Sequence, residues 1–236
     1  MKLAVMQPTY LPWIGYFDLL DQCDRFVLYD HVQFEKQSWQ QRNRIRTAQG
    51  TAWLTVPVHQ ELGQVIVDVR INQTAHWQHK HWMALVSNYR RAPYWDRYQA
   101  ALAAIYERPW ERLADLTIHL IDHLASELGI TTERVRSSSL SPEILQGHKA
   151  EPLVALCHHF GADTYLSPAG ARSYLTSDEP FRVHNLRLEF HAFEHPVWPQ
   201  RFGEFISHLS VIDLLFNVGP EALSAIRSGR CPAEPG

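Results

Sequence analysis

The first thirty residues contain two short apolar runs, residues 2–6 and 25–30, with a helical pattern between them. Both runs are typical of buried strands, and residues 18–23 have the spacing of a helix. A crossover of this length joins parallel strands. We therefore expect an α/β protein with a parallel sheet, and Gly15 at the turn where the first helix begins. Its free backbone amides are expected to face outward, where α/β proteins bind ligands.

The same arrangement recurs in the second half of the chain. We expect strands at residues 133–140, 164–167 and 186–193, and helices at 150–160, 205–216 and 220–227. Residues 51–58 and 64–71 are predicted to be strands, and residues 75–91, 94–106 and 110–129 to be helices. The predicted division is an α/β core in two halves, 1–74 and 131–227, with a helical insert at 75–130 and a frayed tail at 228–236.

Length and charge limit the possible partners. The 236 residues, 45% of them hydrophobic, allow one large core, and the net charge of -3 gives no basic field that would favour nucleic acid. No apolar run is long enough to span a membrane, and Met1 and Lys2 lead directly into a strand, so we expect a cytoplasmic protein. The three cysteines lack a CxxC pair and are expected to be reduced. The oligomeric state is left open.

Two polar stretches follow the first two predicted strands. Their candidate binding residues are Gln7, Tyr10, Trp13, Gly15, Tyr16, Gln33, Lys36, Trp39, Arg42, Asn43 and Arg44. Arginine forks and a lysine suit a phosphate or carboxylate, amides suit sugar hydroxyls, and Trp39 can stack on a base or a sugar ring. The alternatives are an aromatic plug over the end of the sheet and a solvated basic surface.

A second candidate loop follows the strand at 164–167. It contains Ser167, Gly170, Arg172 and Tyr174, and its backbone amides and arginine could hold an anion. An ordinary turn is the alternative.

Several titratable residues are candidates for proton transfer or for structural roles. Asp30 and His81 are the two candidates for a general base. Asp213 lies in an apolar helix with Asn217 on the same side, and both are candidate binding residues. The structural alternative for Asp213 is a tie to Arg42, Arg44 or a backbone amide.

The histidines do not form a complete set of metal ligands, so no metal site is predicted. Neither a Walker motif nor a GxGxxG motif occurs, and the cofactor stays unassigned.

Five sequence blocks together resemble the WbqC-like family: QPTYLPWIGYFDLL, FVLYDHVQFEKQSWQQRNRI, HKHWMALVSNYRRAPYW, GADTYLSPAGARSYL, and HPVWPQ with LSVIDLLFNVG. The family is associated with gene clusters for O-antigen and other surface polysaccharides. The resemblance implies a role in making or modifying a nucleotide-linked sugar.

The opening is also similar to that of the nucleotidyltransferase superfamily, which carries an HxGH motif at this turn. Residues 13–16 read Trp-Ile-Gly-Tyr here, so Gly15 is kept and both histidines are absent. The likeness implies a Rossmann-like parallel sheet of that type, without adenylyl transfer.

The expected function is group transfer, such as acyl or aminoacyl transfer, on a nucleotide-linked amino sugar or a similar activated small molecule. Lys36, Arg42, Arg44 and Arg172 would then hold phosphates, while Gln7, Tyr10, Tyr16, Asn43 and Gln200 would orient the acceptor. The alternative is a non-catalytic protein that binds a nucleotide or another small molecule.

Overall fold

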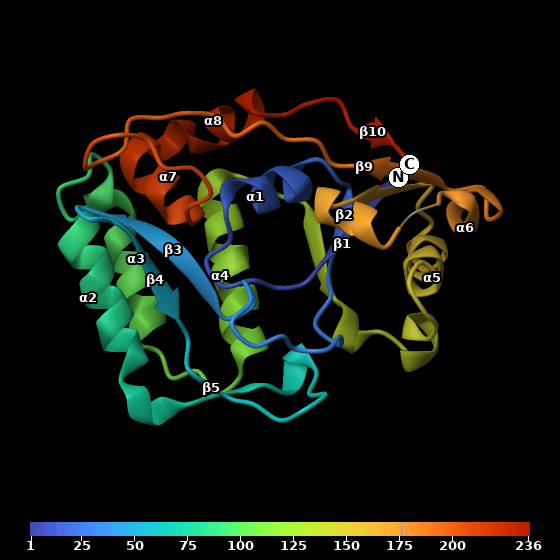
Figure 1. Ribbon diagram of the computed structural model, residues 1–236, viewed down its shortest axis with the longest axis horizontal. Coiled ribbons are helices and arrows are strands. Elements are labelled where there is room, and N and C mark those ends of the chain that lie inside the picture. The colour runs from blue at the N-terminus through green and yellow to red at the C-terminus, as the bar shows by residue number, and fades with distance from the viewer. Residues whose placement is uncertain (176) are drawn as a thin grey trace.

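The computed structural model describes residues 1–175 and 177–236, which form a mixed α/β protein around a mostly parallel sheet (Figure 1). The strands of this sheet lie in the order β10-β9-β8-β1-β2-β7. Their bounds are β1 Lys2–Met6, β2 Arg25–Leu28, β7 Glu133–Arg136, β8 Thr164–Ser167, β9 Arg187–Phe190 and β10 Glu234–Pro235. The first five are parallel to their neighbours, and β10 pairs antiparallel with β9 at the edge.

The order of the strands reverses next to β1. The chain runs from β1 to β2 and β7 in one direction, then returns to the other side of β1 to form β8 and β9. The carboxyl ends of β1 and β8 therefore diverge into loops on opposite sides of the sheet. In open α/β sheets, ligands bind in the crevice outside such a reversal.

Helices cover both faces of the sheet because β1 and β2 are apolar on both sides. Leu3 and Val5 pack on one face with α5 and α6, whereas Ala4 packs on the other face with α1, α4, α7 and α8. The bounds are α1 Ile14–Asp21, α4 Leu113–Leu128, α5 Glu151–Phe160, α6 Glu179–Arg182, α7 Val211–Val218 and α8 Ala222–Ser228.

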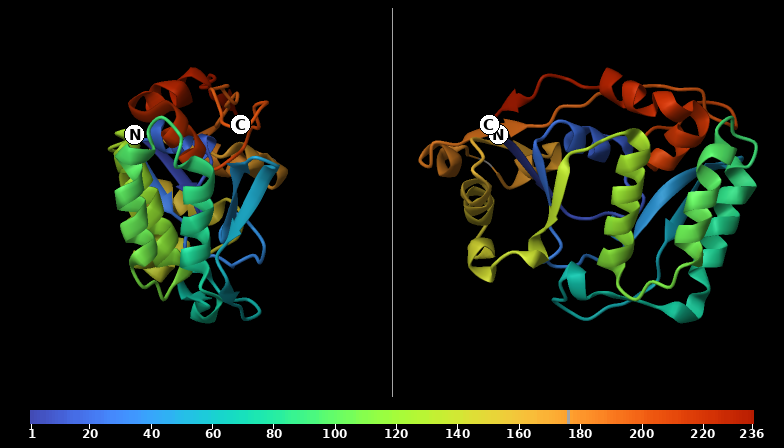
Figure 2. Two further views of the ribbon diagram at one scale, coloured as in Figure 1. Left: turned by 90° about the vertical axis from the view of Figure 1, so that its left-hand side faces the viewer. Right: turned by 180° about the vertical axis from the view of Figure 1, so that it is seen from behind.

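A second layer lies beyond α4, at the opposite end of the molecule from α5 and α6 (Figure 2). It consists of α2 Trp77–Tyr89, α3 Trp95–Glu107 and the hairpin of β3 Arg42–Thr47 with β4 Gly50–Thr55. The short strands β5 Val58–His59 and β6 Arg70–Ile71 pair nearby. Short 3-10 helices occupy Ile66–Asp68, Gln73–Ala75, Ser137–Ser139, Pro142–Leu145, Ala169–Ser173 and Gly219–Glu221.

Three expectations about the elements were wrong. Residues 64–71 do not form one strand, because Ile66–Asp68 is a turn of 3-10 helix and only Arg70–Ile71 is a strand. Residues 205–210 precede α7, because the side chain of Gln200 bonds both the backbone N–H and the carbonyl of Ile206 in place of helical partners. The tail is not frayed, since β10 extends the sheet and the N–H of Gly236 donates to the carbonyl of Leu188.

Candidate functional site

A cavity of about 650 Å³ opens at the carboxyl ends of β1, β2 and β8. Its walls come from the loop after β1, the segment before β3, and the loop after β8. The lining residues are Val5, Met6, Gln7, Thr9, Trp13, Tyr16, Tyr29, Glu35, Ser38, Trp39, Gln40, Asn43, Leu153, Tyr165, Pro168, Gly170, Ala171, Tyr174 and His208. The cavity thus lies where the strand order reverses, the place expected for a ligand.

The lining is mainly apolar and rich in aromatic rings, with a few uncharged polar groups and little charge. Glu35 is the carboxylate among the described lining residues, and no lysine or arginine is found among them. Rings and amides of this kind suit a sugar or another neutral polar molecule more than a bare phosphate. The cavity itself is therefore not a basic pocket.

The side chains of Gln7 and Gln40 form a fixed amide pair in the wall. The backbone N–H of Glu35 donates to Oε1 of Gln40 at 2.9 Å, and Nε2 of Gln40 donates to Oε1 of Gln7 at 2.7 Å. Because a backbone N–H can only donate, it sets the orientation of both amides. The Nε2 group of Gln7 is left available to the cavity as a donor.

Asn43 is held in the same wall by two backbone contacts. Its Nδ2 donates to the carbonyl of Leu11 at 2.6 Å, and its Oδ1 accepts the N–H of Arg44 at 2.7 Å. This ties β3 to the loop after β1 and keeps the wall in one arrangement.

Trp13 covers the start of α1. A Cβ atom at Gly15 would lie 2.3 Å from the Trp13 ring, so only glycine fits beneath the indole. The ring stacks on His208 at 5.1 Å between centroids and on His195 at 6.2 Å. The first turn of α1 is therefore covered by an aromatic side chain, and the expectation of outward-facing free amides there was wrong.

His195 holds His208 in an unusual backbone conformation. His208 has a φ of 59°, and its N–H donates to Nε2 of His195 at 3.1 Å. Nδ1 of His195 then donates to the carbonyl of Pro196 at 2.8 Å, which fixes a neutral imidazole. Burial lowers the pKa of His195, consistent with this neutral form.

Three of the lining residues are tyrosines, namely Tyr29, Tyr165 and Tyr174. Burial raises the pKa of Tyr29 to about 12, and the pKa values of Tyr165 and Tyr174 are raised by the same cause. Tyr165 is fixed by stacking on Phe181. All three are protonated at neutral pH and can donate a hydrogen bond.

Seven of the residues proposed from the sequence lie in the wall of this cavity. They are Gln7, Trp13, Tyr16, Trp39, Asn43, Gly170 and Tyr174. Trp39 is half exposed, and Arg44 lies beside it on β3 with its guanidinium carbon 5.9 Å from the ring centroid. Arg42 and Arg44 therefore lie next to the cavity and outside its lining.

The remaining residues proposed from the two loops lie elsewhere. Lys36 and Gln33 are exposed, and Gln33 forms a bridge with Val65. Ser167 is buried at the end of β8, while Arg172 forms an ion pair with Glu234 and stacks on Phe190. Arg172 is thus turned toward β10 and is neutralised there.

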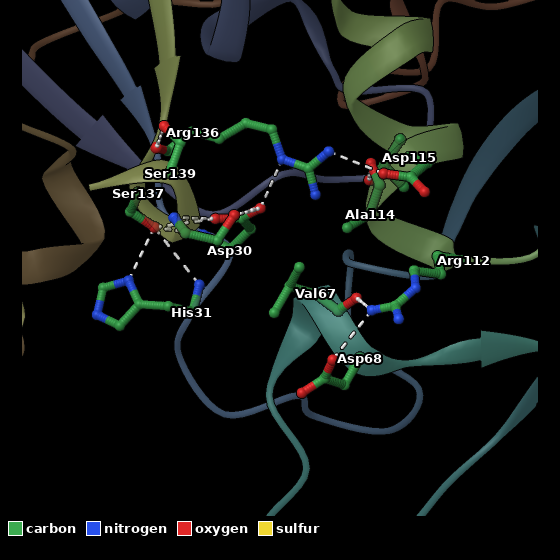
Figure 3. A network of polar contacts seen from close by, with 12 residues as sticks. Asp30, His31, Val67, Asp68, Arg112, Ala114, Asp115, Arg136, Ser137 and Ser139 are labelled. Atoms are coloured by element: carbon green, nitrogen blue, oxygen red, sulfur yellow. Dashed lines mark hydrogen bonds and ion pairs between the residues drawn. The ribbon is translucent and has the colours of Figure 1, made fainter. Parts of the chain in front are cut away.

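Asp30 is fully buried and surrounded by donors (Figure 3). It accepts from Nε of Arg136 at 2.9 Å, from Oγ of Ser137 at 3.0 Å, and from the N–H and Oγ of Ser138 at 2.8 Å each. Its hydrogen bonds join the end of β2 to the segment after β7. Asp30 does not line the cavity.

His81 and Tyr10 belong to a separate buried cluster under α2. Nδ1 of His81 lies 2.8 Å from the hydroxyl of Tyr10, which lies 2.6 Å from the hydroxyl of Tyr106. Burial lowers the pKa of His81 to about 4, so the ring is neutral. Neither His81 nor Tyr10 is part of the lining.

Asp213 ties the segment before α7 to α2. It accepts hydrogen bonds from Nε1 of Trp198 and Nε2 of Gln200 at 2.9 Å, and from the hydroxyl of Tyr89 at 3.0 Å. The expected tie to Arg42, Arg44 or a backbone amide was wrong, because these three side chains surround the carboxylate. Asn217 bonds the carbonyl of Asp213 one turn earlier on α7.

Several lining residues were not singled out from the sequence. They are Val5, Met6, Thr9, Tyr29, Glu35, Ser38, Gln40, Leu153, Tyr165, Pro168, Ala171 and His208. Tyr29 directly follows β2 and Pro168 follows β8, so their position after a strand was an available signal. His208 is brought in by the turn before α7, which no local pattern marks.

Within residues 1–175 and 177–236, no cluster of three or more histidine, cysteine, aspartate or glutamate side chains has a geometry that could hold a metal ion. In the same described part of the chain, every helix is too short or too polar to cross a bilayer.

The chain is similar to known sequences over almost its whole length. It is 36% identical, over 96% of its residues and 97% of the relative, to a Mycobacterium tuberculosis protein named uncharacterized protein Rv1507c. No solved structure matches it. The sequence model of the WbqC-like protein family matches residues 7–225. The chain therefore belongs to the WbqC-like protein family.

Proposed function

We propose that this protein is a group-transfer enzyme that acts on a nucleotide-linked amino sugar or a similar activated small molecule, by acyl or aminoacyl transfer, in surface glycan biosynthesis. The observation that carries the proposal is the cavity of about 650 Å³ at the reversal of the strand order. A cavity of this size accommodates a substituted sugar, and aromatic walls with a few polar groups are typical of small-molecule sites.

The sheet also supports a Rossmann-like relationship with the nucleotidyltransferase superfamily. Its parallel strands follow the order of a doubly wound fold, and the first crossover, from β1 through α1 to β2, begins at the cavity. In the sequence likeness, Trp13 and Tyr16 stand at the places of the two superfamily histidines, and the Trp13 ring packs over Gly15. This argues for transfer of a different group than an adenylyl group.

For acyl transfer, the sugar amine would attack the acyl carbon of an activated donor. The new C–N bond would form as the bond between the acyl carbon and the leaving group breaks, and the leaving group would keep that electron pair. The amine must also lose a proton. We propose His208 as the acceptor of that proton in place of Asp30 and His81, because it lines the cavity and they do not.

Gln7 would bind the acyl oxygen in this reaction. Its Nε2 is the donor left over by the amide pair with Gln40, and a fixed donor stabilises an oxygen on which negative charge develops. Tyr29 and Asn43, which both line the cavity, would contact sugar hydroxyls.

Product formation tests the proposal. The full chain is incubated with nucleotide-linked amino sugars and with activated acyl and aminoacyl donors, and products are identified by mass. We expect a product whose mass is increased by that of the acyl group. The rate of product formation should fall roughly 10²–10⁴-fold in His208→Asn. It should be unchanged in Arg182→Ala, which alters the exposed surface of α6. Absence of product from every pair in the panel would count against catalysis.

A binding protein without catalysis is the second candidate. It is favoured by the position of Asp30 and His81, which are buried in structural networks away from the cavity. Saturable binding of a nucleotide sugar with no product from any donor would support this candidate instead.

A further inference from the structure

Two tryptophans and two arginines share the outward face of the β3–β4 hairpin. Arg44 is opposite Trp53 across the hairpin, and Arg42 lies two residues earlier on the same side of β3. Trp39 reaches over this face, with its ring centroid 5.4 Å from that of Trp53. We call Trp39, Arg42, Arg44 and Trp53 the tryptophan–arginine patch.

The rings of the patch are unusually exposed for tryptophan. Trp39 is 48% and Trp53 46% accessible, although buried aromatic side chains form most of the core elsewhere. Exposed rings that lie together mark interaction sites more often than chance. Two faces at this spacing offer a stacking surface for a planar group.

The arginines of the patch lack a counter-charge. Neither Arg42 nor Arg44 forms an ion pair with a residue in the described part of the chain, whereas Arg136 and Arg230 each pair with carboxylates. Arg42 lies 4.3 Å from the centroid of Trp53. The Nε atom of Arg44 is buried and finds no hydrogen-bond partner among the described residues. Two unneutralised guanidinium groups beside two neighbouring indole rings suit an anion that carries an aromatic ring.

The patch is continuous with the cavity through Trp39. This residue lines the cavity and also contacts Trp53, the other ring of the patch. Since the described lining carries Glu35 and no cation, phosphates would be poorly stabilised inside and well stabilised at the patch. A ligand that spans both regions would place its anionic part outside.

We propose that the tryptophan–arginine patch binds the nucleoside diphosphate part of the substrate. The base stacks on Trp39 and Trp53, the phosphates face Arg42 and Arg44, and the sugar extends into the cavity. This inference rests on the proposed function and adds the direction in which the substrate lies. It also assigns Trp53 to the site.

Calorimetric titration of the full chain tests the assignment. The probes are UDP, TDP, GDP, ADP, glucosamine 1-phosphate and a single-stranded RNA trinucleotide. We expect nucleoside diphosphates to bind, and Trp39→Ala and Trp53→Ala each to weaken them roughly tenfold, as for other bases stacked on aromatic side chains. Arg44→Ala should have a similar effect and should reduce the salt dependence of binding.

Two matched variants separate recognition from loss of structure. Arg182→Ala removes the same charge from α6 and should leave the dissociation constants within about twofold, as expected for a distant exposed charge. Trp39→Phe keeps a stacking ring and should recover most of the affinity lost in Trp39→Ala. Each variant is checked for an unchanged urea midpoint.

Distinct results overturn the assignment. Unchanged affinities in all three alanine variants would place the nucleotide elsewhere, while product formation would still support group transfer. Binding of glucosamine 1-phosphate as tight as that of every nucleoside diphosphate would show that the base is not recognised. A trinucleotide bound tenfold tighter than UDP would assign the patch to RNA, and no binding of any nucleotide would exclude the patch as a nucleotide subsite.

Discussion

Gln40 determines which end of the Gln7 side-chain amide faces the cavity. Its Oε1 is occupied by the N–H of Glu35, so its Nε2 must donate to Oε1 of Gln7. A ligand therefore meets a donor at Gln7 and must offer an acceptor, such as a carbonyl oxygen. This hydrogen-bonding requirement depends on a residue that need not touch the reacting atoms.

Gln40→Glu should reverse this arrangement. The new carboxylate still accepts the N–H of Glu35, but its second oxygen can only accept, so the Gln7 amide must turn and present its oxygen to the cavity. We expect roughly three- to tenfold weaker binding of a carbonyl-bearing ligand, the value of about one neutral hydrogen bond.

Side-chain ¹⁵N NMR follows the same change without a ligand. In the native protein, the Gln7 amide protons should exchange rapidly with water in the cavity. In Gln40→Glu they should become protected, and Gln146→Glu, an exposed control, should have no effect. Equal exchange in all three proteins would contradict the fixed amide pair.

Gly15→Ala should destabilise the protein even though alanine favours helices. The added methyl group would lie 2.3 Å from the Trp13 ring, and the ring would have to leave its stack with His208. We expect a loss of about 1–3 kcal/mol in the free energy of unfolding, typical of overpacking.

A double-mutant cycle measures this contact. With Trp13→Leu as the background, the same Gly15→Ala change should become neutral or stabilising by up to about 1 kcal/mol, because the ring is gone and alanine is the better helix former. Additive effects of the two changes would show that the ring does not cover Gly15.

His81 should make the protein less stable in mild acid. Its pKa is about 4 in the folded state because of burial, and its ordinary value is 6.5. Between these values the unfolded chain binds the proton and the folded chain does not, so stability falls as the pH is lowered from 6.5 to 4. The contribution approaches roughly 3 kcal/mol at the acid end.

His81→Asn should flatten that pH dependence. The Asn oxygen can still accept from Tyr10, but the side chain does not titrate. Urea unfolding measured at intervals from pH 7 to pH 4 gives the slope, with His59→Asn on the surface as the control. If the free energy of unfolding of His81→Asn depends on pH as steeply as that of the native protein, His81 is not the source of the acid sensitivity.

Asp213→Asn should cost about 2–3 kcal/mol of stability. Three groups donate hydrogen bonds to the two oxygens of this carboxylate. In the Asp213→Asn variant the amide NH₂ would replace one of these oxygens and face a donor in a buried site, where neither group has an acceptor. Burial raises the pKa of Asp213, which favours the protonated carboxyl, whereas the three hydrogen bonds donated to it favour the ionised carboxylate. Urea midpoints of Asp213→Asn and of exposed Asp96→Asn provide the comparison.

Local sequence patterns predicted the core of the fold well. The segments β1–α1–β2 and β7–α5–β8 follow from apolar runs and helical spacing, because each element buries its apolar residues against its sequence neighbours. The hairpin β3–β4 was missed at its first strand. Arg42, Asn43 and Arg44 are polar, and their alternation between outward and inward positions is a strand pattern without apolar side chains.

The same alternation explains which of the predicted site residues on β3 face the cavity and which face outward. Asn43 faces inward to the cavity while Arg42 and Arg44 face outward, because neighbouring residues of a strand point to opposite sides. Arg172 forms an ion pair with Glu234 of β10, which lies 62 residues further along the chain. His208 enters the site through tertiary contacts with His195 and Trp13, which a sequence pattern does not encode.

The walls of the cavity come from residues 5–43, residues 153–174 and His208, which meet when β1 and β8 pair. A ligand bound in the cavity contacts both the beginning of the chain and its second half. Separation of β1 from β8 would therefore release the ligand. Resistance to heat and to proteases then rises with the logarithm of the ligand concentration. Fractions of a cell extract can be ranked by how long each delays proteolysis of this protein. The ranking identifies the fraction that contains the natural ligand without an assumption about the chemical class of that ligand.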